Sequence, residues 1–579
     1  MDDIKKSKGT QGFIKGALVL GIANFIVKII GALFKVPLIN LIGDDGSGYF
    51  NVAYQIYTFM FIIATAGFPV AISKMVSESA ARGAETETRK IFRVAFGFLS
   101  VIGLIGTLIM FVFADKLAVL VGIPDATLGI TAIAPAVFFV AMTSAYRGYF
   151  QGRQNMYPTA FSEVVESSGK MLIGLLGAYF FMSMTVNGSL GSAFNFATRE
   201  ISSPHTQTIF ASAGAILGVT LGTLFSCLLL TIIYIVHRRK RAKQVALDKS
   251  RNSKTILKEL IKIAIPITIG ASVSSLTTLI DMGTISRRLV VNPEVFDKYA
   301  FMFSEGTAFF EKVISEGWSG AELLAQKAAT LYGMYTGKAL TMFNLPLTLI
   351  VALATSVVPA IAAAVARNNR SDAKKITEST IRISVLFAAP CAIGMAVLSR
   401  EILYFLFSDY NAHIVLTILS LAIIPVGLVQ VTNSVLQAYG KVYKPVIHMI
   451  IGGTIKVLIN FFCIPYLGID GAPIGTGICY LVIAVLNILS IIKIAGIEFK
   501  WSSFIIKPTL AALIMGAVGF VLSTFLPIGK ALCLVEICIC AIVYGISIFA
   551  VRAVRRDDIL MLPKGEKIAG LLERYKLIK

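Results

Sequence analysis

The sequence predicts an all-α membrane protein made of two copies of one helical bundle, followed by a further pair of helices. Hydrophobic residues make up 56% of the 579 positions, charged residues only 15%, and the mean hydropathy is +0.80. This composition is too apolar for a soluble domain. In addition, long apolar stretches recur along the chain, and the segment around Pro69 returns in similar form around Pro359.

The apolar stretches predict the individual helices, because about 18 to 20 apolar residues in a helix cross a bilayer. Fourteen stretches meet this length, at residues 12–41, 48–77, 92–114, 127–150, 156–183, 208–236, 256–289, 329–366, 380–399, 412–439, 444–466, 471–494, 503–526 and 530–551.

Proline-bearing segments define the repeat. An apolar run with one proline, a polar turn with basic residues and a second apolar run occur around Pro69 and again around Pro359, and the same correspondence links Pro135 with Pro425 and Pro158 with Pro445. The first six stretches and the next six are therefore two repeats, which are parallel because six is even. The predicted division is an N-terminal lobe (1–236), a basic cytoplasmic linker (237–255), a C-terminal lobe (256–494) and two additional helices with a cytoplasmic tail (495–579).

Charge placement predicts the orientation. If the N-terminus is cytoplasmic, most of the 53 Lys and Arg residues fall on the inside, above all in the linker and the tail. The formal charge of +21 then follows from the positive-inside rule, and it does not indicate a nucleic-acid partner. We expect a multi-pass membrane protein with both termini in the cytoplasm, and no cleaved signal peptide.

No residue pattern indicates an enzyme, a metal site or a cofactor. The seven cysteines all fall within predicted spans, where a thiol packs as a small apolar group. The four histidines are scattered without ligand spacing, and no carboxylates or histidines cluster at one membrane face.

Basic residues inside the spans are the strongest site signal, because ionisable groups there are costly and usually face a cavity or a partner. In the first span, Asn24, Lys28, Gly31 and Lys35 recur at helical spacing on one face. An alternative for Lys35 is that it reaches the outer interface.

The other polar groups in the spans have competing interpretations. The second span offers Asn51 and Gln55, and the eighth carries Lys338. Arg287 and Arg288 close the seventh span, where interface anchoring competes with a role in binding. In the fifth span, the spacing of Glu166 and Lys170 favours a neutralising pair over a proton relay.

Two outside segments are longer than connections require, at residues 184–206 and 291–328. The second is acidic, contains Trp318 and can form a short amphipathic helix. Both are candidates for gating the release of cargo, and simple loops are the alternative.

With these features in place, the chain resembles a known family. The turn YRGYFQGRQNMYPTA, the late segment PYLGIDGAPIGTGICY and the 6 + 6 + 2 arrangement are similar to the polysaccharide-transport branch of the multidrug/oligosaccharidyl-lipid/polysaccharide (MOP) exporter superfamily. Within it, the SpoVB/YtgP group, relatives of MurJ-like lipid II flippases, fits best. The resemblance implies a MATE-like V-shaped bundle, with a cavity lined by the first, second, seventh and eighth helices. It also implies that basic cavity residues bind the pyrophosphate of a polyprenyl-linked glycan, a role suited to Lys28, Lys35 and Lys338, with Arg287 or Arg288 as further candidates.

The expected function is therefore a flippase that moves a polyprenyl-pyrophosphate-linked glycan across the membrane by alternating access. Lipid II or a related envelope precursor is the expected substrate, membrane lipids and envelope-synthesis enzymes are the expected partners, and a monomer is the expected functional unit. The alternative is a MATE-like ion-coupled exporter of small molecules, which the basic character of the spans disfavours for cationic drugs.

Energy coupling has two interpretations. The resemblance implies a sodium site between the seventh, eleventh and twelfth helices, for which Asp281, Asn460 and Thr476 supply oxygens. Lys456, one helical turn before Asn460, departs from that pattern. Its ammonium group either replaces the bound cation by pairing with Asp281 or only packs against the lobe interior.

Overall fold

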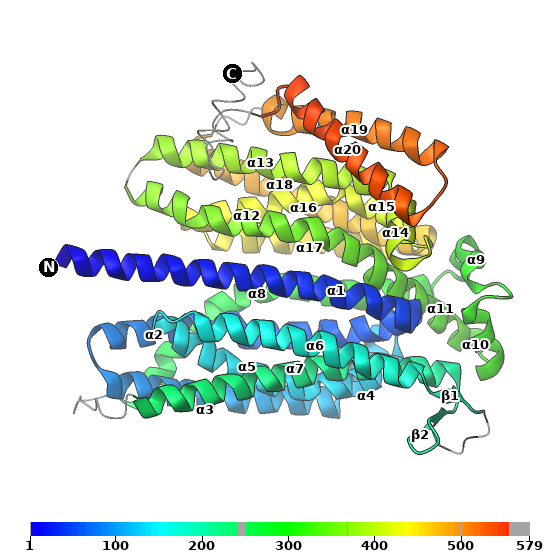
Figure 1. Ribbon diagram of the computed structural model, residues 1–579, viewed down its shortest axis with the longest axis horizontal. Helices are drawn as coiled ribbons and strands as arrows, with labels where there is room; N and C mark the ends of the chain where they lie inside the picture. The colour runs from blue at the N-terminus through cyan, green and yellow to red at the C-terminus, as the bar shows by residue number, and fades with distance from the viewer. Residues whose placement is uncertain are drawn as a thin grey trace. The chain divides into compact units, whose positions relative to one another are not determined.

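The computed structural model describes residues 2–188, 190, 192–240, 251–367, 369–497 and 501–554. Residues 241–250 of the predicted linker and the tail from residue 555 lie outside this described part. The chain forms two compact units (Figure 1), the first comprising Met1–Val290 with Ala300–Gly333 and the second Val291–Tyr299 with Met334–Lys579. The expected all-α class is confirmed, while the division into two lobes and a linker stays a prediction.

The first unit is a bundle of long helices with short elements at their ends. Its elements are α1 (Asp2–Thr65), α2 (Phe68–Ala81), α3 (Glu85–Val112), α4 (Ala114–Val121), η1 (Pro124–Ala126), α5 (Thr127–Gly152), α6 (Tyr157–Met182), α7 (Pro204–Lys240), α8 (Ser253–Leu289), α9 (Ala300–Phe303), α10 (Ala308–Glu316) and α11 (Gly320–Met334). A small sheet of order β1-β3-β2 occupies the predicted outer segment before α7, with β1 (Thr185–Val186), β2 (Phe194–Asn195) and β3 (Glu200–Ile201).

Helix α1 is broken at Gly43, which has φ 72° and ψ −174°. A residue with a side chain rarely adopts this left-handed conformation, so glycine permits the bend. The bend divides α1 into the first two predicted spans and brings residues on either side of it together.

Small residues let α6 and α7 approach closely. A Cβ added to Gly177 would lie 2.6 Å from the carbonyl oxygen of Gly214, and one added to Gly218 would lie 2.3 Å from the backbone nitrogen of Gly174. Close contact between backbones at small residues is a usual way for helices to associate within a bilayer. This tight pair supports the site described below, since α6 carries one of its lysines.

The second unit consists of helices throughout. They are η2 (Pro293–Tyr299), the π-helical turn η3 (Tyr335–Ala339), α12 (Leu340–Ala366), α13 (Arg370–Val397), α14 (Ser399–Phe407), α15 (His413–Leu421), α16 (Ile423–Ala438), α17 (Tyr443–Leu467), η4 (Gly468–Asp470), α18 (Gly471–Ala495), the π-helical turn η5 (Ser502–Ile506), α19 (Lys507–Phe525) and α20 (Lys530–Ala550).

Within the described ranges, nine helices are long and apolar enough to cross a membrane, or ten if the bent pair α15 and α16 is one span. Two of the nine, Ile22–Ala81 and Tyr443–Ala495, contain 60 and 53 residues, far more than one crossing requires. The predicted count of fourteen is not confirmed, because several predicted spans are continuous with their neighbours.

Candidate functional site

The bend in α1 brings two of the expected site residues together. Lys35 precedes Gly43 and Asn51 follows it, and Lys35 Nζ donates a hydrogen bond to Asn51 Oδ1 at 3.3 Å. The Asn51 amide nitrogen donates in turn to the Ser47 carbonyl oxygen at 2.7 Å and to its hydroxyl at 3.1 Å. Asn51 is buried, so this chain of hydrogen bonds fixes the acceptor that Lys35 uses.

A second lysine joins this place from α6. Lys170 Nζ lies 4.0 Å from the centre of the Tyr54 ring and 5.3 Å from that of Phe34. It is also near enough to Lys35 for the two ammonium groups to repel each other. The aromatic faces partly offset that repulsion. We call Phe34, Lys35, Asn51, Tyr54 and Lys170 the Lys35–Lys170 cluster.

The expected pair between Glu166 and Lys170 is replaced by another. Glu166 Oε2 accepts a hydrogen bond from Arg147 Nη2 at 2.7 Å, and the same guanidinium group donates to the hydroxyls of Ser162 at 3.1 Å and Ser226 at 3.3 Å. This buried network ties α5, α6 and α7 together. Because Glu166 is paired with Arg147, the ammonium group of Lys170 interacts instead with the aromatic rings of Tyr54 and Phe34 and with Lys35.

Arg147 is a residue that the sequence analysis did not identify as a partner of Glu166. Its position within the YRGYFQGRQNMYPTA turn was the available signal. The structure therefore assigns the ion pair with Glu166 to Arg147. Lys170, which the sequence predicts to pair with Glu166, belongs to the candidate site instead.

The remaining expected residues of the first unit lie outside this cluster. Asn24 and Lys28 are exposed on α1, and Lys28 lies two helical turns before Lys35. Gln55 is half-buried on the second part of α1. Arg287 is exposed at the end of α8, where its Cγ would lie 3.5 Å from a Cβ added to Gly122, and Arg288 is half-buried.

In the second unit, Lys338 has a carboxylate partner that the sequence did not reveal. Lys338 lies in the π-helical turn η3 and is only 4% exposed. Its Nζ atom is 2.5 Å from Oδ2 of Asp409, in the loop between α14 and α15. Such single π-helical turns occur frequently at functional sites. Within the second unit, however, the charge of Lys338 is already balanced.

The three expected coupling residues of the second unit lie on the adjacent helices α17 and α18. Lys456 and Asn460 are one turn apart on α17, and both are buried. A Cβ on Gly475 would lie 2.3 Å from Asn460 Oδ1, so this amide oxygen rests against α18 one residue before the buried Thr476. The Thr476 hydroxyl donates to the Ala472 carbonyl oxygen at 3.1 Å. Asp281 belongs to α8 of the first unit, and its pairing with Lys456 stays a prediction.

Segment 291–328, which the sequence predicts to lie outside the membrane, is divided between the two units. In the second unit, Asn292 Nδ2 donates to the Pro465 carbonyl oxygen at 3.0 Å, and Lys298 forms an ion pair with Asp470. These contacts fasten η2 to the turn between α17 and α18, which belongs to the PYLGIDGAPIGTGICY segment.

The part of this segment in the first unit is also held by side-chain contacts. Gln326 Nε2 donates to Asp125 Oδ2 at 2.5 Å, the Tyr49 hydroxyl donates to Gln326 Oε1 at 2.9 Å, and the buried Trp318 ring lies 4.7 Å from the His205 ring. The segment is therefore a structured element of both units and not a simple loop.

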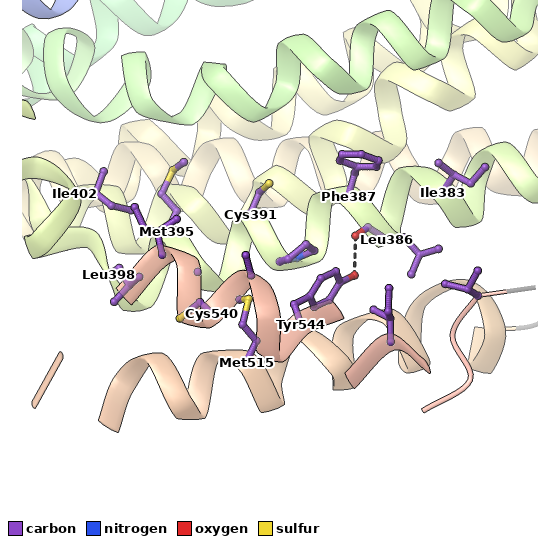
Figure 2. Close-up of a pocket in the computed structure, with 16 residues that line it drawn as sticks. Ile383, Leu386, Phe387, Cys391, Met395, Leu398, Ile402, Met515, Cys540 and Tyr544 are labelled. Atoms are coloured by element: carbon purple, nitrogen blue, oxygen red, sulfur yellow. Dashed lines mark hydrogen bonds between the residues drawn. The ribbon is translucent and has the colours of Figure 1, made fainter. Parts of the chain in front are cut away.

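The last two helices form an apolar groove with α13 and α14 (Figure 2). Its volume is about 600 Å³, and the residues around it are almost all hydrocarbon or sulfur side chains, including Leu386, Phe387, Cys391, Leu398, Met515 and Ile537. The one polar group labelled there, the Tyr544 hydroxyl, donates to the Leu386 carbonyl oxygen at 2.7 Å. Such a lining suits a hydrocarbon chain.

Comparison with known proteins relates both parts of the chain to one superfamily. Residues 13–202 match the family model "Polysaccharide biosynthesis protein", and residues 322–538 match "Lipid II flippase MurJ". The chain is 23% identical to stage V sporulation protein B of Bacillus subtilis (strain 168), covering 96% of this chain and 98% of that protein. It is 24% identical to lipid II flippase MurJ of the same organism, covering 87% and 86%.

Solved structures show the same fold at lower identity. A lipid II flippase MurJ in an inward closed conformation aligns with a TM-score of 0.64 and 15% identity, covering 92% of this chain and 98% of that one. An inward-facing multidrug resistance MATE family transporter of the MOP superfamily aligns with a TM-score of 0.58 and 15% identity, covering 82% and 98%. Family models, relatives and solved structures together relate this chain to the MurJ-like group of the MOP exporter superfamily.

The apolar helices and these similarities support a multi-pass protein of the bacterial cytoplasmic membrane, and the MurJ and MATE proteins that it resembles are flippases and transporters rather than catalysts. The fold places the Lys35–Lys170 cluster in one unit and the apolar groove in the other.

Proposed function

We propose that this MOP-superfamily protein is a flippase for a polyprenyl-diphosphate-linked glycan, with lipid II or a related envelope precursor as its substrate. The observation that carries the proposal is the Lys35–Lys170 cluster. Within the described residues, its two ammonium groups contact an amide and aromatic rings but form no ion pair with a carboxylate. Their positive charge is therefore available to an anionic headgroup, and a diphosphate is a strong acceptor for such donors.

The apolar groove supports a substrate with a long hydrocarbon tail. The groove between α13, α14, α19 and α20 is lined by apolar side chains, which suits a polyprenyl chain better than a water-soluble drug. The relative named lipid II flippase MurJ supports the same substrate class. A cationic drug would instead require acidic side chains where the Lys35–Lys170 cluster lies, so the basic cluster favours the flippase over the small-molecule exporter.

Complementation tests the substrate. In a bacterium depleted of its own lipid II flippase, we expect this chain to restore growth, because it would supply the missing movement of the diphosphate-linked precursor. Colony formation after depletion is the measurement, and immunodetection in isolated membranes confirms insertion. A well-inserted protein that leaves the cells unable to grow would exclude lipid II as the substrate and would favour another lipid-linked glycan.

Labelling from outside the cell tests the proposed orientation, in which both termini are cytoplasmic. Ser315 is exposed on α10, in the outer segment. In a background without the seven native cysteines, Ser315→Cys should react with an impermeant thiol reagent in intact cells, because α10 is proposed to lie on the outside. A cysteine at Ser253, the first residue of α8, should react only after the membrane is opened. The opposite pattern at both positions would reverse the topology.

A further inference from the structure

Two glutamates of the second unit are buried without an evident purpose. Glu401 on α14 is 6% exposed and Glu536 on α20 is 1% exposed. The Oε2 atom of each is buried, and neither finds a hydrogen-bond partner among the described residues. A buried carboxylate oxygen without a hydrogen bond is unfavourable when the group is ionised, so a proton or another ligand on the group would relieve this cost.

The two carboxyl groups belong to one place. Glu401 and Glu536 are near enough to repel each other electrostatically, and Cys533, one turn before Glu536, interacts with both. The neighbouring turns also converge, since a Cβ added to Gly519 of α19 would lie 3.0 Å from Cys540 Sγ and 4.0 Å from Leu398 Cδ2. Leu398 precedes Glu401 by one turn and Cys540 follows Glu536 by one turn, so each glutamate shares a helix face with a residue of that contact.

The surrounding charged and titratable groups do not neutralise this pair. Arg400 interacts with Glu401 but directs its Nη2 atom to His413 Nε2 at 3.4 Å, and Lys530 Nζ donates to the Ser408 hydroxyl at 2.9 Å. No ion pair of either glutamate occurs within the described part of the chain. The other titratable side chains that face the pair or line the adjacent groove are the Tyr544 phenol, which donates to the Leu386 carbonyl oxygen, and the thiols of Cys391, Cys533 and Cys540.

The number of carboxyl groups in the pair indicates whether its ligand is a proton or a metal ion. Two adjacent carboxylates cannot both remain ionised in a medium of low dielectric constant unless a cation lies between them, and the usual solution is one shared proton. The searched, described residues contain no group of three or more His, Cys, Asp or Glu side chains that could hold a metal ion. With only two carboxyl groups, the site fits a proton better than a metal.

We propose that Glu401 and Glu536 form a proton-binding carboxyl pair at the edge of the apolar groove. Ile402 and Ile537, which directly follow the two glutamates in the chain, both line this groove. While the pair holds its proton, α14 and α20 stay packed together. Loss of the proton places two repelling charges beside the groove and drives α14 and α20 apart, so the proton controls the shape of the groove.

Infrared titration of the full chain in lipid nanodiscs tests this proposal in sodium-free buffer. The background is Glu163→Gln, because Glu163 is another glutamate with a buried oxygen that lacks a partner among the described residues. We expect a carbonyl-stretch band of a protonated carboxyl group at neutral pH that disappears as the pH rises. Adding Glu401→Gln should remove the repulsion and shift the titration midpoint of Glu536 down by at least about one pH unit, and Glu536→Gln should do the same for Glu401. The variant with both changes should lose the band.

Glu78→Gln is the matched control, because Glu78 is exposed and pairs with Lys74 at 4.0 Å. It should leave the band and its midpoint unchanged. A band that survives in the variant with both glutamates replaced would overturn the proposal, as would the absence of any band at neutral pH in the Glu163→Gln background. Loss of the band on adding sodium at constant pH would also overturn it, since the pair would then bind a metal cation. The background titration needs no change in the pair, so the absence of a band there would refute the proposal even if the variants do not fold.

Discussion

Replacing both Lys35 and Lys170 by methionine is expected to slow glycan flipping by roughly two orders of magnitude. Methionine keeps most of the length and apolar stem of lysine but removes the charge that we propose binds the diphosphate. A charge-assisted hydrogen bond contributes about 1.5 to 3 kcal/mol, so losing two such contacts costs about 3 kcal/mol or more, which corresponds to about a hundredfold in rate. Translocation of a fluorescent polyprenyl-diphosphate-linked glycan in proteoliposomes measures the effect.

Lys116→Met is the matched control for this experiment. Lys116 is also a lysine over an aromatic ring, with its Nζ atom 5.4 Å from the centre of the Phe113 ring, but it is exposed on α4. Its replacement should leave flipping unchanged. In the same assay, Lys28→Ala tests the exposed lysine that shares a face of α1 with Lys35. Lys28→Arg should retain part of the flipping activity if charge matters more than shape. Normal flipping by well-inserted protein lacking both Lys35 and Lys170 would refute the proposed headgroup site.

The sequence predicted the chemistry of this cluster better than its geometry. Helical spacing on the first span indicates Lys35, and the second span offers Asn51, but only the structure, with its break at Gly43, shows that the two form a hydrogen bond. The overall class could be predicted because hydropathy is a local property of the chain. The count of fourteen crossings stays unconfirmed, because within the described residues single long helices such as Ile22–Ala81 cover more than one predicted span.

Pairing at a distance was the main property that the sequence did not reveal. Local spacing favours Glu166 with Lys170, four residues apart, but the guanidinium group of Arg147 on another helix donates from Nη2 to the Glu166 carboxylate instead. Likewise, Lys338 finds Asp409 across 71 positions of sequence. Neither partner stands near its counterpart in the sequence, so a single chain without structure gives no basis for these pairs.

Flipping in proteoliposomes is expected to respond to an imposed membrane potential and to be indifferent to sodium. Lys456 is buried one turn before Asn460, so its ammonium group repels a sodium ion from the amide oxygen that rests against α18. A potential of 100 mV changes the free energy of one charge crossing the membrane by about 2.3 kcal/mol. This free energy corresponds to roughly a fiftyfold change in rate at most. Flipping rates under potassium–valinomycin potentials, with sodium exchanged for an organic cation, are the measurement.

Lys456→Met should make flipping dependent on sodium. Without the ammonium group, the side-chain oxygens of Asn460 and Thr476 become available to a cation, so flipping should acquire a dependence on sodium. Lys444→Met is the control, because Lys444 also lies on α17 and contacts Ser490 of α18 at 3.4 Å, and it should preserve the wild-type response. Strict sodium dependence of the unaltered protein would contradict substitution of the cation by Lys456. It would instead support Asp281, Asn460 and Thr476 as a sodium site, with Lys456 serving only to pack the interior of its unit.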